Sequence, residues 1–85
     1  MGVSKRTEQM EKKYTTPIRW YSKGQLALKY FPQAATKDIA EKRLMRWIRH
    51  CHGLEERLKQ LGYKRSRKRL SPRMVYEIFE HLGDP

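Results

Sequence analysis

The chain has 85 residues, of which 38% are hydrophobic and 34% charged. This length suits a single domain with a thin core, and the composition is too apolar for a disordered tail and too polar for a membrane protein. Twenty Lys and Arg against nine Asp and Glu give a net charge of +11, which attracts polyanions, and nucleic acids are the commonest of these.

Cysteine content and the N-terminal sequence bear on the compartment. Cys51 is the single cysteine and forms no internal disulfide, so nothing favours an oxidising environment. The N-terminus has basic residues, but no apolar segment with a small-residue cleavage site follows them. No stretch is apolar enough to span a membrane. We therefore expect a cytoplasmic protein without a membrane contact.

In chain order, the first predicted elements are an arm and a strand. Residues 1–17 are almost wholly polar and end at Pro17, which predicts a flexible N-terminal arm, with residues 18–85 forming one domain. Ile18-Arg19-Trp20-Tyr21 is rich in strand formers and predicts one short edge strand.

Two helices are predicted next. Ser22-Lys23-Gly24-Gln25 has the Ser-x-x-Gln form of a capping box, so the first helix begins here, and Pro32 ends it. Thr36 is the predicted N-cap of the second helix, which runs to about His50 or Cys51. One apolar stripe of this second helix is expected to face the core, and it consists of Ala40, Leu44, Trp47, Ile48 and Cys51.

The last third of the chain predicts a helix, a hairpin and a closing helix. Leu54, Leu58 and Leu61 mark one face of a short third helix between Gly53 and Gly62. Residues 64–73 hold six basic and no acidic residues, and they predict a two-stranded hairpin with its tip near residues 65–68. Ser71-Pro72 supplies an N-cap and a proline at the first position of a fourth helix, which Gly83 stops.

The second helix carries the first group of candidate site residues. Lys42, Arg46 and Arg49 share the face opposite the apolar stripe, with Arg43 and His50 beside them. Such a face is typical of a recognition helix in the DNA major groove, where Arg binds guanine edges. The alternative is an ordinary solvated face, but Glu41 is the only acid among residues 39–52.

The predicted hairpin carries the second group, which consists of Lys64, Arg65, Arg67, Lys68 and Arg69. Like charges at this density repel one another unless a polyanion neutralises them, so we expect contacts with the phosphate backbone. Lys23, with Arg19 and Lys29, is predicted to add phosphate contacts beside the first helix, whose N-terminus offers backbone N–H groups. Four aromatic residues are candidates for stacking on the bases of a single strand, namely Trp20, Tyr21, Trp47 and Tyr63, but core packing is favoured for most of them.

Metal and catalytic motifs are not evident in the sequence. His50, Cys51 and His52 are consecutive in a predicted helix, so their side chains point about 100° apart and do not converge on one ion. The paired ligand spacing of zinc sites is missing, as are glycine-rich phosphate loops and a nucleophile with a base. We expect no metal, no cofactor and no enzymatic activity.

The order of these elements resembles the winged helix-turn-helix of MerR-type and excisionase-type DNA-binding proteins. The stretch Tyr21-Ser22-Lys23-Gly24-Gln25-Leu26-Ala27 looks like the opening strand and first helix of that layout. Leu70-Ser71-Pro72-Arg73-Met74-Val75 looks like the step from the wing into the last helix. The helix Leu54 to Leu61 is an addition to the minimal excisionase layout.

The chain is also similar to a family of short, basic bacterial proteins without an established activity. The motifs that carry this similarity are Trp47-Ile48, Gly53-Leu54, Leu61-Gly62-Tyr63, Ser71-Pro72 and the ending His81-Leu82-Gly83-Asp84-Pro85.

Together these features predict a mainly α domain with a small β-hairpin, similar to a winged helix-turn-helix, that binds double-stranded DNA. A small transcriptional regulator or an excisionase-like recombination accessory factor is the expected role. Two alternatives remain open, namely an RNA-binding or ribosome-associated module and an adaptor that docks on an acidic protein partner. A homodimer through the arm or an exposed face also remains open.

Overall fold

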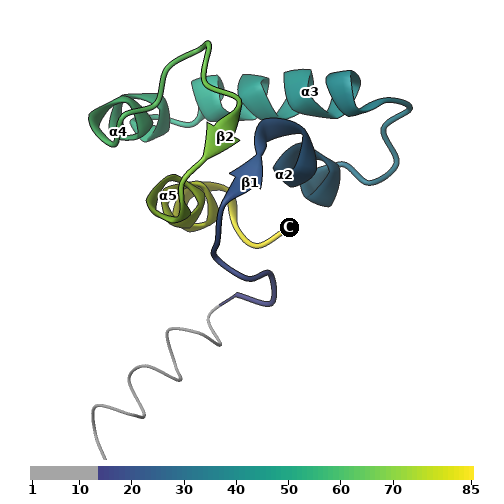
Figure 1. Cartoon of the computed structure of the whole chain (residues 1–85), viewed down its shortest axis with the longest axis horizontal. Helices are drawn as coiled ribbons and strands as arrows, with labels where there is room; N and C mark the ends of the chain where they lie inside the picture. Colours follow the sequence, from purple (N-terminus) through teal and green to yellow (C-terminus); the bar gives the residue numbers. More distant parts are fainter. Residues whose placement is uncertain (1–13) are drawn as a thin grey trace, which may run out of the picture.

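The computed structural model describes residues 14–85, which fold into four helices and one small antiparallel sheet (Figure 1). In chain order the elements are β1 (Tyr21–Ser22), α2 (Lys23–Tyr30), α3 (Lys37–His50), α4 (Leu54–Gln60), β2 (Arg69–Leu70) and α5 (Pro72–Leu82). The predicted mainly helical fold with a two-stranded sheet is therefore confirmed.

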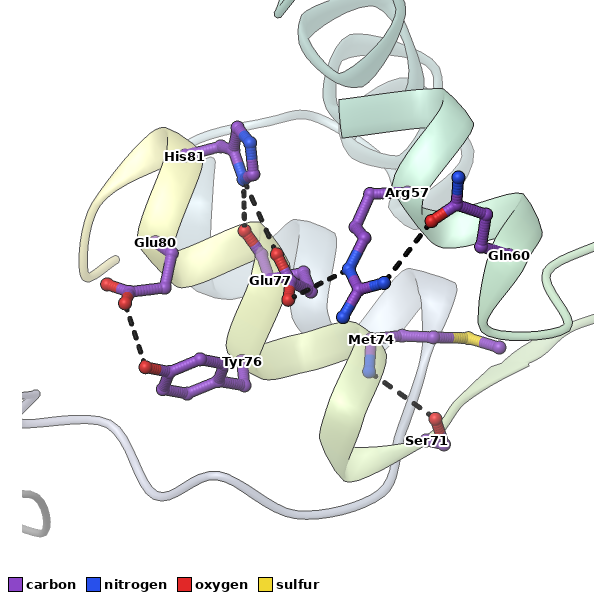
Figure 2. Close-up of polar contacts among 8 residues, drawn as sticks. All are labelled: Arg57, Gln60, Ser71, Met74, Tyr76, Glu77, Glu80 and His81. Atoms are coloured by element: carbon purple, nitrogen blue, oxygen red, sulfur yellow. Dashed lines mark hydrogen bonds and ion pairs between the residues drawn. The ribbon is translucent and has the colours of Figure 1, made fainter. Parts of the chain in front are cut away.

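Three helices begin at the residues that the sequence predicted, because polar side chains cap them. Ser22 and Gln25 form the complete capping box of α2, with both hydrogen bonds at 3.0 Å. The Thr36 hydroxyl accepts from the Ile39 N–H at 3.1 Å at the start of α3. The Ser71 hydroxyl caps α5 in the same way, by accepting from the Met74 N–H at 3.4 Å (Figure 2).

The end of α4 is a glycine-dependent turn. Gly62 has a φ of +99°, which only glycine adopts without strain. The N–H groups of Gly62 and Tyr63 donate to the carbonyls of Lys59 and Leu58 at 3.0 and 2.9 Å, the hydrogen-bond pattern of a Schellman motif. Tyr63 thus follows directly on the end of this helix, and it starts the loop that leads to β2.

The core is built from one face of each helix. Its largest fully buried side chains include Leu26, Leu44, Leu58 and Phe79, one each from α2, α3, α4 and α5. Because these faces converge, the inward side of α3 is fixed at Ala40, Leu44 and Ile48, as the periodicity predicted.

The prediction that Trp47 faces the core is wrong, since its side chain is 46% exposed. Trp47 lies about 60° around α3 from Leu44, at the border of the buried stripe. Its ring instead packs edge-on against Phe31, with 4.8 Å between ring centroids, and against Tyr30, at 6.4 Å. Cys51, the last member of the stripe, is only partly buried.

The small sheet joins segments that are far apart in the sequence. Tyr21 pairs with Leu70 and Ser22 with Arg69, so the predicted strand at residues 18–21 is shortened and shifted to β1. The predicted pairing within residues 64–73 is wrong, because β2 pairs with β1 instead. Residues 64–69 hold no apolar side chain, so a local hairpin would have no face to bury. Pairing with β1 buries both Tyr21 and Leu70.

Polar contacts join α4 to α5 and extend along α5 (Figure 2). Arg57 Nε lies 3.2 Å from Glu77 Oε1, and Arg57 Nη1 donates to Gln60 Oε1 at 3.2 Å. One turn further along α5, His81 Nδ1 lies 2.8 Å from the Glu77 carbonyl oxygen. An acid of α5 is thus engaged with a cation of α4, and the hollow that both residues line includes none of the predicted site residues.

The last residues of the predicted arm contact the folded domain. Residues 1–13 of the predicted arm lie outside the described residues, but residues 14–17 pack onto the fold. The Tyr14 ring lies edge-on to Phe79, with 5.3 Å between centroids. The backbone N–H groups of Thr15 and Thr16 donate to the Asp84 carboxylate at 2.6 and 3.3 Å, and the Thr15 hydroxyl also donates to it. The two ends of the described chain are therefore tied together.

This junction makes a pH-dependent contribution to stability. Hydrogen bonds from the side chain and backbone of Thr15, then from Thr16, lower the pKa of Asp84 from 3.8 to about 2. Because the folded-state pKa lies below the ordinary value, the stabilisation is present at neutral pH and is lost as the pH falls from about 4 to about 2. We expect Asp84→Asn to lower Tm at pH 7, with the difference from the wild type shrinking below pH 4 in circular dichroism melts. A difference that stays constant down to pH 2 would contradict this.

Candidate nucleic-acid interface

The outer face of α3 presents the first group of predicted cations to solvent. Lys42, Arg46 and Arg49 lie opposite the buried Ala40, Leu44 and Ile48, and all three are exposed. They line one open hollow along the helix together with His50, and Asp38 and Glu41 stand at its N-terminal half. The positive charge of this face is therefore concentrated in the second half of α3.

The second group lies in the segment of residues 64–69, which we call the basic segment. In Figure 1 the loop between α4 and β2 rises to the same edge of the molecule as α3. Lys64 and Arg65 line a hollow of about 430 Å³ together with Arg49 of α3. The Tyr63 hydroxyl, just before this segment, donates to the Met45 sulfur at 3.3 Å. The structure thus brings the first half of the basic segment to the side of α3 that carries Arg49.

Lys23, which was predicted to add a phosphate contact, is largely buried. Its side chain is only 6% exposed, and its ammonium donates to the Arg65 carbonyl at 2.9 Å. The same ammonium lies 4.8 Å from the centroid of the Tyr63 ring, and the Lys23 backbone N–H donates to the Lys68 carbonyl at 2.9 Å. The Lys23 ammonium therefore holds the backbone of the basic segment, and the side chain also lines the hollow of Arg49, Lys64 and Arg65.

At the N-terminus of α2, where backbone contacts with a phosphate were predicted, two of the N–H groups are bonded within the protein. The first N–H of the helix, from Lys23, is bonded to Lys68, and the N–H of Gln25 is bonded to the Ser22 hydroxyl. These two donors, which would have bound a phosphate, are already satisfied.

The second half of the basic segment faces another part of the surface. The Arg67 guanidinium lies over the Trp20 ring, 5.8 Å from its centroid, and its Nε donates to the Arg69 carbonyl at 3.2 Å. Arg69 lines a separate hollow with Arg19, Trp20 and Lys29. Arg43 and Lys68 are exposed, but neither lines these hollows. Of the ten predicted site residues, all within the described chain, nine are exposed and Lys23 is buried.

Two features of this surface were missed from the sequence. Glu41 and Glu55 line the same hollow as Arg49 and Lys64, so part of the positive charge there is balanced. Core packing was favoured for most of the four aromatic residues considered, yet Trp20, one of them, is 49% exposed. Strand alternation was the signal that could have found it. Because Tyr21 points inward in β1, its neighbour Trp20 must point to the opposite side.

Within residues 14–85, no three His, Cys, Asp or Glu side chains lie close enough together to hold a metal ion. None of the helices in the described part of the chain combines the length and apolarity needed to cross a bilayer.

The fold and this surface place the protein in a broad class, that of small, strongly basic helical domains with cations gathered on one side. Residues 17–85 match a family described as a domain of unknown function (DUF4248), and the chain belongs to that family. No curated protein and no solved structure matches the chain. The predicted similarity to a family without an established activity is confirmed, and the matched range includes all the site residues considered above.

The contacts of Lys23 generate a prediction about the basic segment. Lys23→Met keeps the aliphatic stem but removes the bond to the Arg65 carbonyl, and hydrogen bonds to charged groups contribute about 1.5 to 3 kcal/mol. We expect unfolding free energy to fall by about this amount in urea, and trypsin to cleave within residues 64–69 several times faster. Lys29→Met, at an exposed position of the same helix, is the matched control and should change neither quantity appreciably.

Proposed function

We propose that this protein binds double-stranded DNA, with α2 and α3 acting as a helix-turn-helix and α3 lying in the major groove. The observation that carries the proposal is the shared hollow of Arg49, Lys64 and Arg65, which puts the α3 cations and the first half of the basic segment on one side of the molecule. In this arrangement Arg46 and its neighbours contact base edges, and the basic segment contacts the phosphate backbone as a wing does.

The dimensions of α3 suit this role. Its 14 residues make a helix about 21 Å long, and the major groove of B-form DNA, about 12 Å wide, admits one α-helix. From Lys42 to Arg49 the exposed face rises roughly 10 Å, which corresponds to about three base pairs. The major groove of A-form RNA is too narrow and deep for side chains to read, so the same face favours duplex DNA over duplex RNA.

The small size of the domain and its open hollows, of which those beside α3 and α5 mix acids with cations, favour a binding role without catalysis or a cofactor. A transcriptional regulator or a recombination accessory factor is the role that we propose, because both need only a compact DNA reader. Competition between duplex DNA and structured RNA at equal phosphate concentration separates this role from the two alternatives. An RNA-binding module would prefer the RNA, and an adaptor for an acidic protein would bind neither nucleic acid.

The salt dependence of duplex binding tests the proposal. If Lys42, Arg46, Arg49, Lys64 and Arg65 each neutralise one phosphate, log affinity falls with log salt at a slope of about −4.5. Fluorescence anisotropy with a random-sequence duplex should then show affinity dropping roughly 500-fold between 50 and 200 mM salt. Salt-insensitive binding, no binding, or displacement by RNA in preference to duplex DNA would reject the proposal.

A pair of charge-matched variants tests whether the duplex contacts α3. Arg46→Gln should weaken duplex binding about tenfold or more and reduce the salt slope by about 1. Arg73→Gln removes the same charge at an exposed position of α5, in a hollow with Arg57 and Glu77 and none of the α3 cations. It should leave the slope unchanged within error. Equal effects of the two variants would mean that net charge alone, and not the α3 face, determines binding.

A further inference from the structure

A second basic surface lies away from α3, around an exposed tryptophan. Arg19, Lys29 and Arg69 line an open hollow of about 630 Å³ with Trp20, whose side chain is 49% exposed. None of the seven residues that line this hollow in the described chain is acidic. This distinguishes it from the hollow beside α3, in which Glu41 and Glu55 accompany the cations.

The surroundings of Trp20 differ from those of the other half-exposed tryptophan. Trp47 packs edge-on against the rings of Phe31 and Tyr30, so it completes an aromatic cluster at the border of the core. Within residues 14–85, the ring of Trp20 contacts a cation, the Arg67 guanidinium, at 5.8 Å. Trp20 therefore presents an indole within a positively charged setting, and the core does not explain its position.

The cations around Trp20 are held close to the hollow. Arg19 and Lys29 lie over the ring of the buried Tyr21, with 5.2 and 5.7 Å from their charged ends to its centroid. Arg69 is fixed by the pairing of β2 with β1. Three positive charges from three separate segments of the chain thus line the same hollow as Trp20, and none of the residues that line it is an acid that would balance them.

From this arrangement we propose that the hollow is a second nucleic-acid site, which binds an unpaired nucleotide of a single strand. The base stacks on Trp20, and its neighbouring phosphates are bound by Arg19, Lys29 and Arg69. Sites for single strands combine an aromatic stacking platform with a positively charged groove that follows the backbone, and they tolerate any base because each has a π-face. A paired base in a duplex has its faces covered by its neighbours, so the unpaired strand is the ligand that fits.

This inference goes beyond the proposed duplex binding and does not depend on it, because none of the α3 cations lines the hollow. A protein with both sites would contact a duplex through α3 and an adjoining unpaired strand through Trp20, as at a junction or a melted end.

Tryptophan fluorescence tests the site directly. The chain has two Trp residues, so the Trp47→Phe variant reports on Trp20 alone. We expect a short oligo(dT) to quench this fluorescence on binding, because a stacked base contacts the indole. Inorganic polyphosphate of equal charge should bind the cations without comparable quenching. Absence of quenching by oligo(dT), or equal quenching by polyphosphate, would overturn the inference.

Variants at the platform and at its cations complete the test. Trp20→Ala should weaken oligo(dT) binding about tenfold and change duplex affinity less than twofold, with Trp47→Phe as the control that changes neither. Arg19→Gln together with Lys29→Gln should also weaken oligo(dT) binding, even if Trp20→Ala proves poorly folded by circular dichroism. Loss of duplex and oligo(dT) affinity to the same extent in well-folded Trp20→Ala would also overturn the inference. Failure of the duplex proposal would instead appear as missing salt-dependent duplex binding while oligo(dT) still quenches Trp20.

Discussion

The position of the basic segment depends on one buried cation. Residues 64–69 carry five positive charges and no apolar side chain, so they neither bury surface of their own nor attract one another. The Lys23 ammonium holds the segment through the Arg65 carbonyl, and the Lys23 backbone N–H holds it through the Lys68 carbonyl. The Tyr63 ring lies beside the same ammonium and its hydroxyl reaches Met45 of α3. The backbone is thereby fixed next to α3 while the charged side chains of the segment remain exposed.

This restraint explains how one short chain presents two different basic surfaces. Lys23 contacts the middle of the segment. Before this contact point, Lys64 and Arg65 lie near Arg49. After it, Arg67 and Arg69 lie near Trp20. Several acids are engaged elsewhere. Glu77 pairs with Arg57 between α4 and α5, and Asp84 binds Thr15 and Thr16 at the junction of the chain ends. The proposed duplex and single-strand sites both follow from this separation of charge.

Local signals in the sequence predicted the parts of the fold that local interactions determine. The caps at Ser22, Thr36 and Ser71 and the glycine turn at Gly62 each involve residues within a few positions, so their patterns were sufficient. The inward face of α3 also followed from its periodicity, except at its border, where Trp47 packs on other rings instead of entering the core.

The features that the sequence did not predict depend on contacts between distant segments. No short-range pattern indicates that Leu70 pairs with Tyr21, and this pairing removes the predicted hairpin. The burial of Lys23 follows from the same long-range approach, because residues 65 and 68 supply the carbonyls that its donors need. The exposure of α3 cations was foreseeable from helix geometry, whereas their proximity to Lys64 and Arg65 required the tertiary structure.

The most direct measurement of the central claim is an NMR titration of the ¹⁵N-labelled protein with a short DNA duplex. If α3 and the first half of the basic segment form one surface, the largest amide shifts will fall together on the second half of α3 and on residues 64 and 65, at the same duplex concentration. The account is contradicted if the largest shifts fall on α5, or if α3 and the basic segment respond at clearly different duplex concentrations.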